Sequence, residues 1–536
     1  MSRVTETSMD HKTAVDFTIL SATELAAGIA KYEFTATQVV EAYIKRIEQV
    51  NPPLNAIVVP LFEQARQEAH DADQKLAQGQ NVGPLHGVPI TIKESFHVKG
   101  TPSTLGVTTL AFHRATQDSI LVERLRGAGA IVLGKTNVPQ LLLYNETDNP
   151  LYGRTNNPWN LERSCGGSSG GEAAIVAAGG SALGLGSDIG GSLRTPALAC
   201  GINSLKPTSG RLSGSGTADI NIWPGLEGII NQYGPMARSV ADLKLAMSIL
   251  AAPGQEAVDP AIAPVAWRDP EVVKLQGLRI GFYTDDGFFP AAPALKRAVH
   301  EAAHALQMAG VIVEEFQPPN VIHAMRLFFG ILAADGGNNA RRIIGQSKYD
   351  RRVSGLIQLA NLPNSIRLAL TRLLKFAKQP RLAVTLEWLN KQSATGYWEL
   401  IAARKQYQLN FLAALDAKKL DGLICPPHAL PALTHGSSYY LSSAASYSML
   451  YNLLGMPAGV VAATRVRPGE ESTGTNLSQL DIIERTAQTV MKGSTGLPIG
   501  VQVVGRHWRE DIVLAIMSTL EKHFKTQADY PTRPPL

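Results

Sequence analysis

Cysteine is scarce in this sequence, whose 536 residues include only Cys165, Cys200 and Cys425. Three cysteines cannot form a full disulfide framework, and these have neither the pairing nor the spacing of a metal site. The opening residues, MSRVTETSMDHKTAVDF, contain neither the apolar stretch of a secretory signal nor the arginine-rich, acid-poor pattern of a transit peptide. These absences predict a cytoplasmic protein.

A large excess of charge of one sign is also missing. The chain has 50 Lys and Arg residues against 45 Asp and Glu residues, a formal net charge of +5. This balance does not provide the dominant basic field with which proteins bind nucleic acids, so we expect no nucleic-acid partner. Hydrophobic residues make up 45% and charged residues 18% of the sequence, a composition that allows a large core and excludes a disordered or fibrous chain.

Uninterrupted apolar segments of membrane-spanning length are absent as well. The longest run without Asp, Glu, Lys or Arg extends from Gly422 to Thr464. A transmembrane helix needs about 20 consecutive apolar residues, and this run is broken by Pro426, Pro427, Pro431, Gly436, Gly455 and Pro457. We therefore expect packed loops, one helix and a buried strand here, and no membrane span.

What the sequence does contain is an alternation of strand and helix patterns. Two helices with capping boxes open the chain, Ser21 with Glu24 and Thr35 with Gln38. The alternation predicts an α/β fold, a single large domain with a mixed central β-sheet covered by helices. Strands are predicted at 88–92, 130–133, 311–315, 422–425, 458–463 and 498–504, and helices at 119–127, 171–178, 240–250, 294–309 and 510–524.

The same patterns suggest a division of the chain. We expect an N-terminal helical region over residues 1–82, a catalytic domain over 83–525 and a short C-terminal tail over 526–536. A mostly helical insertion is expected within the catalytic domain, at about 320–415.

One short motif formally matches the phosphate-binding P-loop. It runs from Gly129 to Thr136, with sequence GAIVLGKT. A functional P-loop has a flexible turn between its glycines, whereas this segment places the strand-forming residues Ala-Ile-Val-Leu there. We therefore expect a strand and no nucleotide site.

A second motif, His300-Glu301-Ala-Ala-His304, has the spacing of a zinc peptidase helix. However, the apolar stripe of this predicted helix lies on the opposite face, and position 310 is glycine where one class of these enzymes needs a third histidine. A solvated helix face is the favoured interpretation, and a zinc peptidase is kept as an alternative that chelator-insensitive activity would exclude.

A third motif, Gly166-Gly167-Ser168-Ser169-Gly170, satisfies the G-x-S-x-G pattern of α/β-hydrolases. That pattern requires a strand running directly into the serine, but the preceding residues 156–165 have the composition of a loop. By itself the motif indicates a flexible turn.

The third motif is part of a longer pattern that changes its meaning. From Gly166 to Thr208 the chain reads GGSSGGEAAIVAAGGSALGLGSDIGGSLRTPALACGINSLKPT, and upstream, from His86 to Glu94, it reads HGVPITIKE. These segments resemble the amidase signature family in their glycine- and serine-rich stretch, their D-I-G-G-S-x-R element and their upstream lysine. Three segments in the right order are far more specific than any four-residue pattern.

The resemblance implies a Ser-Ser-Lys triad of Ser192, Ser168 and Lys93. Ser192 is the expected nucleophile, Lys93 the base and Ser168 the proton relay between them. Lys93 ends an apolar strand, and burial of a lysine disfavours its charged form, so part of it can be a neutral amine near pH 7.

The resemblance also implies supporting residues. The main-chain amides of Ile189, Gly190, Gly191 and Ser192 are expected to form the oxyanion hole, since glycines let the main chain approach a carbonyl closely. Leu142 is expected to contact the acyl group, and the loops are expected to be oriented by Ser169, Asp188 and Arg194. No cofactor and no metal are expected.

Other segments resemble the branch of this family that hydrolyses fatty acid amides, among them 136–140, 149–153, 234–238, 451–460 and 496–498. The expected activity is hydrolysis of linear carboxylic amides, with fatty acid amides such as N-acylethanolamines or primary fatty amides as substrates. The open alternatives are an amidase or esterase for small aryl or aliphatic substrates, and an ammonia-supplying glutaminase subunit of an amidotransferase.

One further feature bears on lipids. Between Arg351 and Leu386 there are seven basic residues and no acidic ones, and residues 366–378 are expected to form a basic amphipathic helix within a region of possible membrane contact at about 356–378. Its polar face is expected to carry Arg367, Arg372, Lys375 and Lys378. Such a helix can lie in a membrane interface, or it can pack on the core or at a homodimer contact. The first alternative predicts a cytoplasmic protein that binds membranes peripherally.

Overall fold

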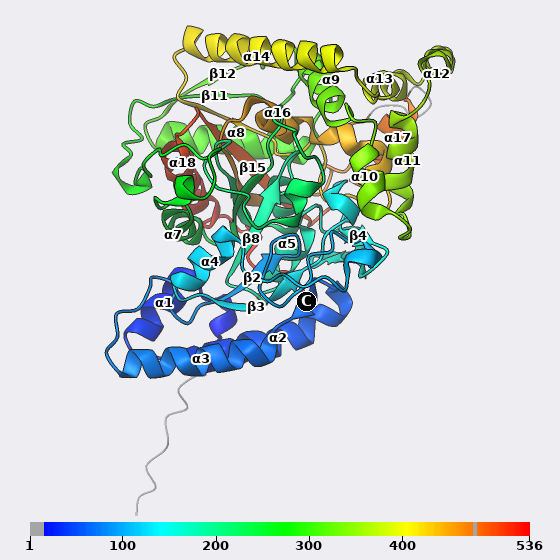
Figure 1. Cartoon of the computed structure of the whole chain (residues 1–536). Helices are drawn as coiled ribbons and strands as arrows, with labels where there is room; N and C mark the ends of the chain where they lie inside the picture. The colour runs from blue at the N-terminus through cyan, green and yellow to red at the C-terminus, as the bar shows by residue number, and fades with distance from the viewer. Residues whose placement is uncertain (1–14, 475–479) are drawn as a thin grey trace, which may run out of the picture.

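An 11-stranded mixed β-sheet runs through the centre of the molecule in this computed structural model, which describes residues 15–474 and 480–536 (Figure 1). In spatial order its strands are β1 (Ile57–Pro60), β3 (Ile131–Thr136), β2 (Pro89–Lys93), β8 (Leu183–Asp188), β10 (Gln232–Ala237), β9 (Asn203–Lys206), β14 (Ala458–Arg465), β15 (Pro498–Gly505), β13 (Gly422–Cys425), β11 (Arg279–Phe282) and β12 (Ile312–Glu315). Two small sheets pair β4 (Asp148–Asn149) with β5 (Gly153–Arg154) and β6 (Asn156–Asn157) with β7 (Asn160–Ser164).

The direction of the strands makes the sheet mixed. Strands β3, β2 and β8 run parallel, as do β13, β11 and β12, while the strands between these two groups pair antiparallel. Helices cover the sheet, among them α4 (Ile120–Gly127), α5 (Gly170–Ala177), α6 (Arg194–Cys200), α7 (Val240–Leu250), α8 (Pro293–Met308), α16 (Ser446–Leu454) and α18 (Glu510–Phe524), while α15 (Ser438–Leu441) and α17 (Ile482–Met491) pack on each other. The predicted single α/β domain is confirmed.

The N-terminal segment packs along one end of the molecule (Figure 1). Its helices are α1 (Ala22–Ala30), α2 (Ala36–Leu54) and α3 (Phe62–Ala77), and both expected capping boxes are present, at Ser21 and at Thr35. Between α2 and α3 the structure adds β1, a strand that the sequence patterns did not predict and that pairs antiparallel with β3.

Three central strands, β8, β9 and β10, were also not predicted. Two of them, β8 and β10, contain glycine or proline, which disfavour a strand locally. These residues reflect close packing. A Cβ atom at Gly184 would lie 2.3 Å from the Glu172 carboxylate, and one at Gly234 would lie 1.9 Å from the Leu205 carbonyl oxygen. Glycine is therefore required at Gly234, where the neighbour is main chain, and a side chain at Gly184 would have to displace the buried Glu172 carboxylate.

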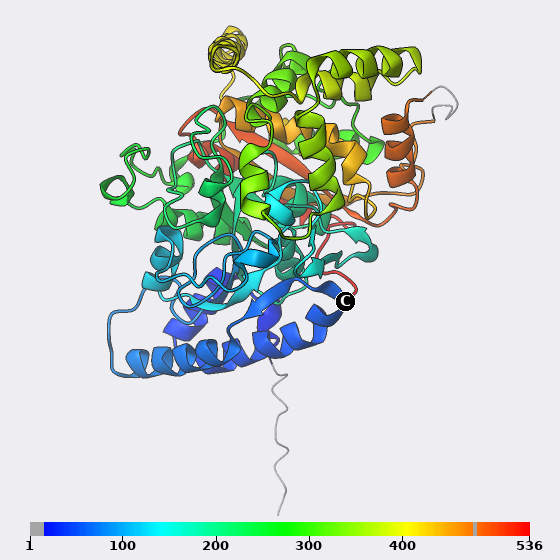
Figure 2. The same ribbon diagram turned by 45° about the vertical axis from the view of Figure 1, so that its right-hand side comes forward.

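Six helices occupy residues 321–417, and most of them lie at the end of the molecule opposite α2 and α3 (Figures 1 and 2). They are α9 (Val321–Leu332), α10 (Asn338–Ile344), α11 (Arg351–Ala360), α12 (Asn364–Phe376), α13 (Pro380–Trp388) and α14 (Ala394–Ala417). None of the helices in residues 15–474 and 480–536 combines the length and the hydropathy needed to cross a bilayer.

Candidate active site

Lys93 is the last residue of β2, and sheet pairing determines what lies beside it. Strand β2 runs parallel to β8, with Ile92 opposite Leu185, so the carboxyl ends of both strands meet at one edge of the sheet. In α/β sheets this edge is where ligands usually bind. Lys93 is thereby placed next to Ser187 and Asp188, which end β8.

The Lys93 side chain has no exposed surface, and its Nζ atom lies within hydrogen-bonding distance of three oxygen atoms. Its Nζ atom lies 2.8 Å from Ser168 Oγ, 2.9 Å from Ser187 Oγ and 3.3 Å from the Ser187 carbonyl oxygen. Burial lowers the pKa of Lys93 from its ordinary value of 10.5 to about 7, although the negative charges of Asp219, Asp188 and Glu172 oppose this change. A substantial fraction of this lysine is therefore a neutral amine at neutral pH.

The loop that carries Ser168 is bonded to the loop that carries Ser192. The Ser169 amide donates to the Ser192 carbonyl oxygen over 3.1 Å, and Thr195 Oγ1 donates to the Gly167 carbonyl oxygen over 2.9 Å. Ser169 Oγ donates to the Ser187 carbonyl oxygen over 3.1 Å. These bonds place the expected relay and the expected nucleophile on adjoining loops, and both serines are buried.

Asp188 and Arg194 form a fully buried ion pair beneath the Ser192 loop. Arg194 donates to both Asp188 carboxylate oxygens over 3.0 Å, and its remaining donors bind Ser448, Gln502 and Asn452. Burial alone would raise the pKa of Asp188, but the charge and hydrogen bonds of Arg194 outweigh it and hold that pKa well below its usual range. Asp188 beneath the Ser192 loop therefore stays ionised at neutral pH.

The Asp188 carboxylate shapes the loop by accepting main-chain hydrogen bonds. It accepts from the amides of Gly191, over 2.7 Å, and Leu193, over 3.0 Å. Gly191 has φ +109°, where side chains are strained, and a Cβ atom there would lie 2.9 Å from Ser448 Cβ. Within the described chain, the amides of Ile189, Gly190 and Ser192 have no hydrogen-bond acceptor. Three of the four expected oxyanion donors are therefore free, and the fourth is engaged by Asp188.

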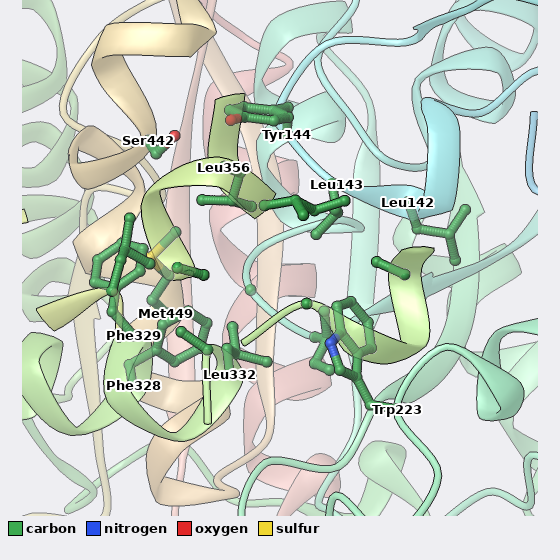
Figure 3. A pocket seen from close by; sticks show the side chains of 18 of the residues that line it. Leu142, Leu143, Tyr144, Trp223, Phe328, Phe329, Leu332, Leu356, Ser442 and Met449 are labelled. Atoms are coloured by element: carbon green, nitrogen blue, oxygen red, sulfur yellow. The ribbon is translucent and has the colours of Figure 1, made fainter. Parts of the chain in front are cut away.

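An apolar pocket opens beside Ser192 (Figure 3). Figure 3 shows Phe328, Phe329 and Met449 gathered on one side, and Leu142 and Trp223 on the other. Four segments that are distant in sequence line the pocket: residues 142–145, the Ser192 loop, α9 and α11. Their lining residues are Leu142, Leu143, Tyr144 and Asn145; Ile189, Gly190 and Ser192; Phe328, Phe329 and Leu332; and Leu356, Ile357 and Ala360. Its walls suit a hydrocarbon chain.

Several of these residues carried no sequence signal. Ser187 is adjacent to the signature but was not singled out, and Trp223, Phe328 and Met449 read as ordinary apolar positions. Glu172 was also missed: it accepts from Thr91 over 2.6 Å and from Thr136 over 2.8 Å, and burial raises its pKa to about 8. The aromatic lining could not be recognised because it comes together only in the fold.

The two rejected motifs take the structures predicted for them, and Thr136, at the end of the first, pairs with Lys93 in the sheet. The P-loop-like segment forms strand β3, as predicted, and the buried Lys135 binds the Pro102 carbonyl and Ser103 Oγ. His300 and His304 are exposed on α8, as the solvated-face interpretation predicted.

Comparison with known proteins identifies the family. A family model described as Amidase matches residues 38–514. Fatty-acid amide hydrolase 1 of Sus scrofa is 35% identical over 502 residues, which cover 93% of this chain and 85% of that protein. Fatty acid amide hydrolase 1 of Caenorhabditis elegans is 34% identical over 495 residues, covering 91% and 85%. A solved structure of fatty acid amide hydrolase matches with a TM-score of 0.81 and 28% identity, covering 94% of this chain and 85% of that one.

Fold, site and relatives together define an amide-hydrolysing enzyme. The chain belongs to the amidase signature family, and the predicted resemblance is confirmed.

Proposed function

We propose that this enzyme is a serine amidase that uses Ser192, Ser168 and Lys93 to hydrolyse amides with an apolar acyl chain. The observation that carries the proposal is the 2.8 Å contact between the buried Lys93 Nζ and Ser168 Oγ, beside a loop that opens into an apolar pocket. A buried amine that is hydrogen-bonded to a serine hydroxyl can act as a general base where no histidine is present.

The surroundings of Lys93 orient its lone pair. A neutral amine has two N–H donors, and Ser187 offers two acceptors, its carbonyl oxygen and its Oγ. With both donors used there, the lone pair faces Ser168 Oγ and can accept the proton of that hydroxyl. Lys93 takes this proton while Ser168 takes the proton of Ser192, and Ser192 Oγ attacks the carbonyl carbon.

The developing oxyanion is stabilised by main-chain amides. The free N–H groups of Ile189, Gly190 and Ser192 are the donors, and the Gly191 amide instead holds the loop in shape through Asp188. The proton then returns from Lys93 through Ser168 to the leaving nitrogen, and the C–N bond breaks. Water repeats the sequence on the acyl-enzyme: it loses a proton to the Ser168–Lys93 pair, and Ser192 regains one as the carboxylic acid leaves.

The substrate class follows from the pocket and the relatives. The lining is dominated by Leu, Phe, Met and Trp side chains, and relatives covering most of the chain are named fatty acid amide hydrolases. We assign amides of fatty acids, including N-acylethanolamines or primary fatty amides, as substrates.

Acyl-chain length provides the test of this assignment. For amides of one amine, kcat/KM is expected to rise by about fourfold for each added methylene that the pocket buries, at about 0.8 kcal/mol each. Steady-state kinetics from acetyl to long acyl amides measure the slope. Leu332→Asn, in the pocket wall, should weaken the dependence of kcat/KM on acyl-chain length and change kcat/KM for acetyl amides little. A profile that peaks at short or aryl acyl groups would favour the small-substrate amidase, and preference for esters would favour the esterase.

Peripheral membrane contact through α12 is part of the proposal. The apolar side chains Ile366, Leu370, Leu373 and Phe376 are exposed, with Phe376 at 88%, and Arg372 and Lys375 are exposed beside them. Arg367, expected on the polar face, is instead buried, because its guanidinium donates to carbonyl groups that end α11 and α13, including those of Ala360 and Leu386. The outward apolar surface favours an interface over packing on the core.

Sedimentation with anionic vesicles tests this contact. Binding is expected at low ionic strength and should weaken as salt is added, because part of the attraction is electrostatic. Phe376→Glu should weaken binding about tenfold or more, by analogy with the loss of a buried aromatic side chain. Met308→Glu, an exposed apolar position on α8, is the matched control and should bind like wild type. Absence of wild-type binding at low salt would remove the membrane proposal.

A further inference from the structure

A second pocket lies on the other side of two residues that line the first. Ile189 and Trp223 contribute to both, so the second pocket adjoins the loop of the free amides. Its further lining comes from the 3-10 helix η4 (Ala218–Asn221), from Tyr233 of β10, from the segments 225–231 and 258–262, and from Gly210, Leu212, Gly214 and Ser215. No lysine or arginine of the described residues lines it.

Asp219 is the buried carboxylate of this second pocket, with 5% of its surface exposed. It accepts from the Asn231 amide and, over 3.4 Å, from the Tyr233 hydroxyl, both neutral donors. Among residues 15–474 and 480–536, no lysine or arginine forms an ion pair with it. Its hydrogen-bond donors are neutral, so the charge of this carboxylate is only partly compensated; burial raises the pKa of Asp219, and the charge of Lys93 opposes this rise.

The main chain fixes Asp219 beside the catalytic lysine. The Ala218 amide donates to the Ser95 carbonyl oxygen over 2.8 Å, and Thr217 forms an antiparallel bridge with Phe96. These contacts tie η4 to the residues that directly follow Lys93. The charge of Asp219 opposes the fall in the pKa of Lys93 more than that of Asp188 or Glu172, which agrees with this placement.

In the proposed mechanism the substrate has two halves, an acyl chain and a leaving amine. The acyl chain occupies the apolar pocket, and the leaving nitrogen must face the Lys93–Ser168 pair that protonates it. The pocket that contains Asp219 adjoins Ile189, so it is the space available to the remainder of the amine. We infer that Asp219 selects the amine half of the substrate, and that the enzyme prefers amides whose leaving amine carries a second, positively charged nitrogen. This inference rests on the proposed function.

Three amides of one fatty acid provide the test, with amine parts of equal length that end in a methyl, a hydroxyl or an ammonium group. A hydrogen bond to a buried charge should raise kcat/KM of the ammonium substrate about tenfold or more above that of the methyl substrate. In wild-type enzyme this advantage should disappear as pH rises through the pKa of the terminal ammonium. Equal rates for the hydroxyl and ammonium substrates would overturn selection by charge.

Asp219→Asn is the decisive variant, and Glu227→Gln, an exposed carboxylate of the same pocket, is its matched control. Loss of the Asp219 charge also alters Lys93, but that effect acts on all three substrates and cancels in their ratio. The ammonium-to-methyl ratio should fall about tenfold in Asp219→Asn and stay within about twofold of wild type in Glu227→Gln. An unchanged ratio in Asp219→Asn would overturn the inference.

If the Asp219→Asn variant does not fold, the ammonium-to-methyl ratio of wild-type enzyme and its pH dependence test the inference instead. If wild-type enzyme hydrolyses the methyl substrate without preferring the ammonium one, only this inference fails; if it hydrolyses none, the proposed function fails.

Discussion

Replacing Ser192 with alanine is expected to lower kcat/KM for amide hydrolysis by about 10⁴-fold or more, because the acyl-enzyme can no longer form. Ser192 lines the apolar pocket and is 6% exposed, so removal of one hydroxyl changes the packing little. Steady-state kinetics measure the loss, and a thermal unfolding curve shows that the variant is folded. Activity within tenfold of wild type would contradict the assignment of the nucleophile.

Covalent labelling separates the two serines of the site. A fluorophosphonate probe should modify Ser192 in wild-type enzyme, as peptide mapping by mass spectrometry can show. Ser168→Ala is the matched variant: it should still be labelled at Ser192, but more slowly, because the proton relay is missing. Modification of Ser168 in wild-type enzyme would instead support the interpretation of the 166–170 motif as the G-x-S-x-G nucleophile motif of α/β-hydrolases.

Replacing Lys93 with methionine is expected to lower kcat/KM by about 10²- to 10⁴-fold, the usual contribution of general acid–base catalysis. The pH dependence supplies a more specific test. Burial lowers the pKa of Lys93 to about 7, and the proposed mechanism requires the neutral amine. The kcat/KM of wild-type enzyme should therefore rise with pH through about 7 and level off above it. This rise should disappear in Lys93→Met.

Lys206 provides a matched control for this prediction. Burial lowers its pKa to about 7 as well, but its Nζ atom donates to the carbonyl oxygens of Pro207 and Met456 and contacts neither serine of the triad. Lys206→Met should keep the rise in kcat/KM near pH 7. If the rise vanished in Lys206→Met and persisted in Lys93→Met, the base would have been assigned to the wrong lysine.

Elements with strong local signals were predictable. Helices α1 and α2 begin at Ser21 and Thr35, where capping boxes satisfy their first amides, and α7 and α18 coincide with the predicted ranges. Strands β8 and β10 escaped prediction because their glycines and proline disfavour a strand locally. Close packing of neighbouring strands and helices determines those residues, and no local pattern records it.

The order of motifs around Lys93, Ser168 and Ser192 was sufficient, from the sequence by itself, to determine the family and the class of reaction, since side-chain chemistry and chain order are both written there. Only the tertiary structure decided that Lys93 is fully buried, that Ser187 hydrogen-bonds it, and that Trp223 lines the pocket beside Ser192. The physical reason is that desolvation and cavity shape arise from contacts between distant segments, which local sequence does not specify.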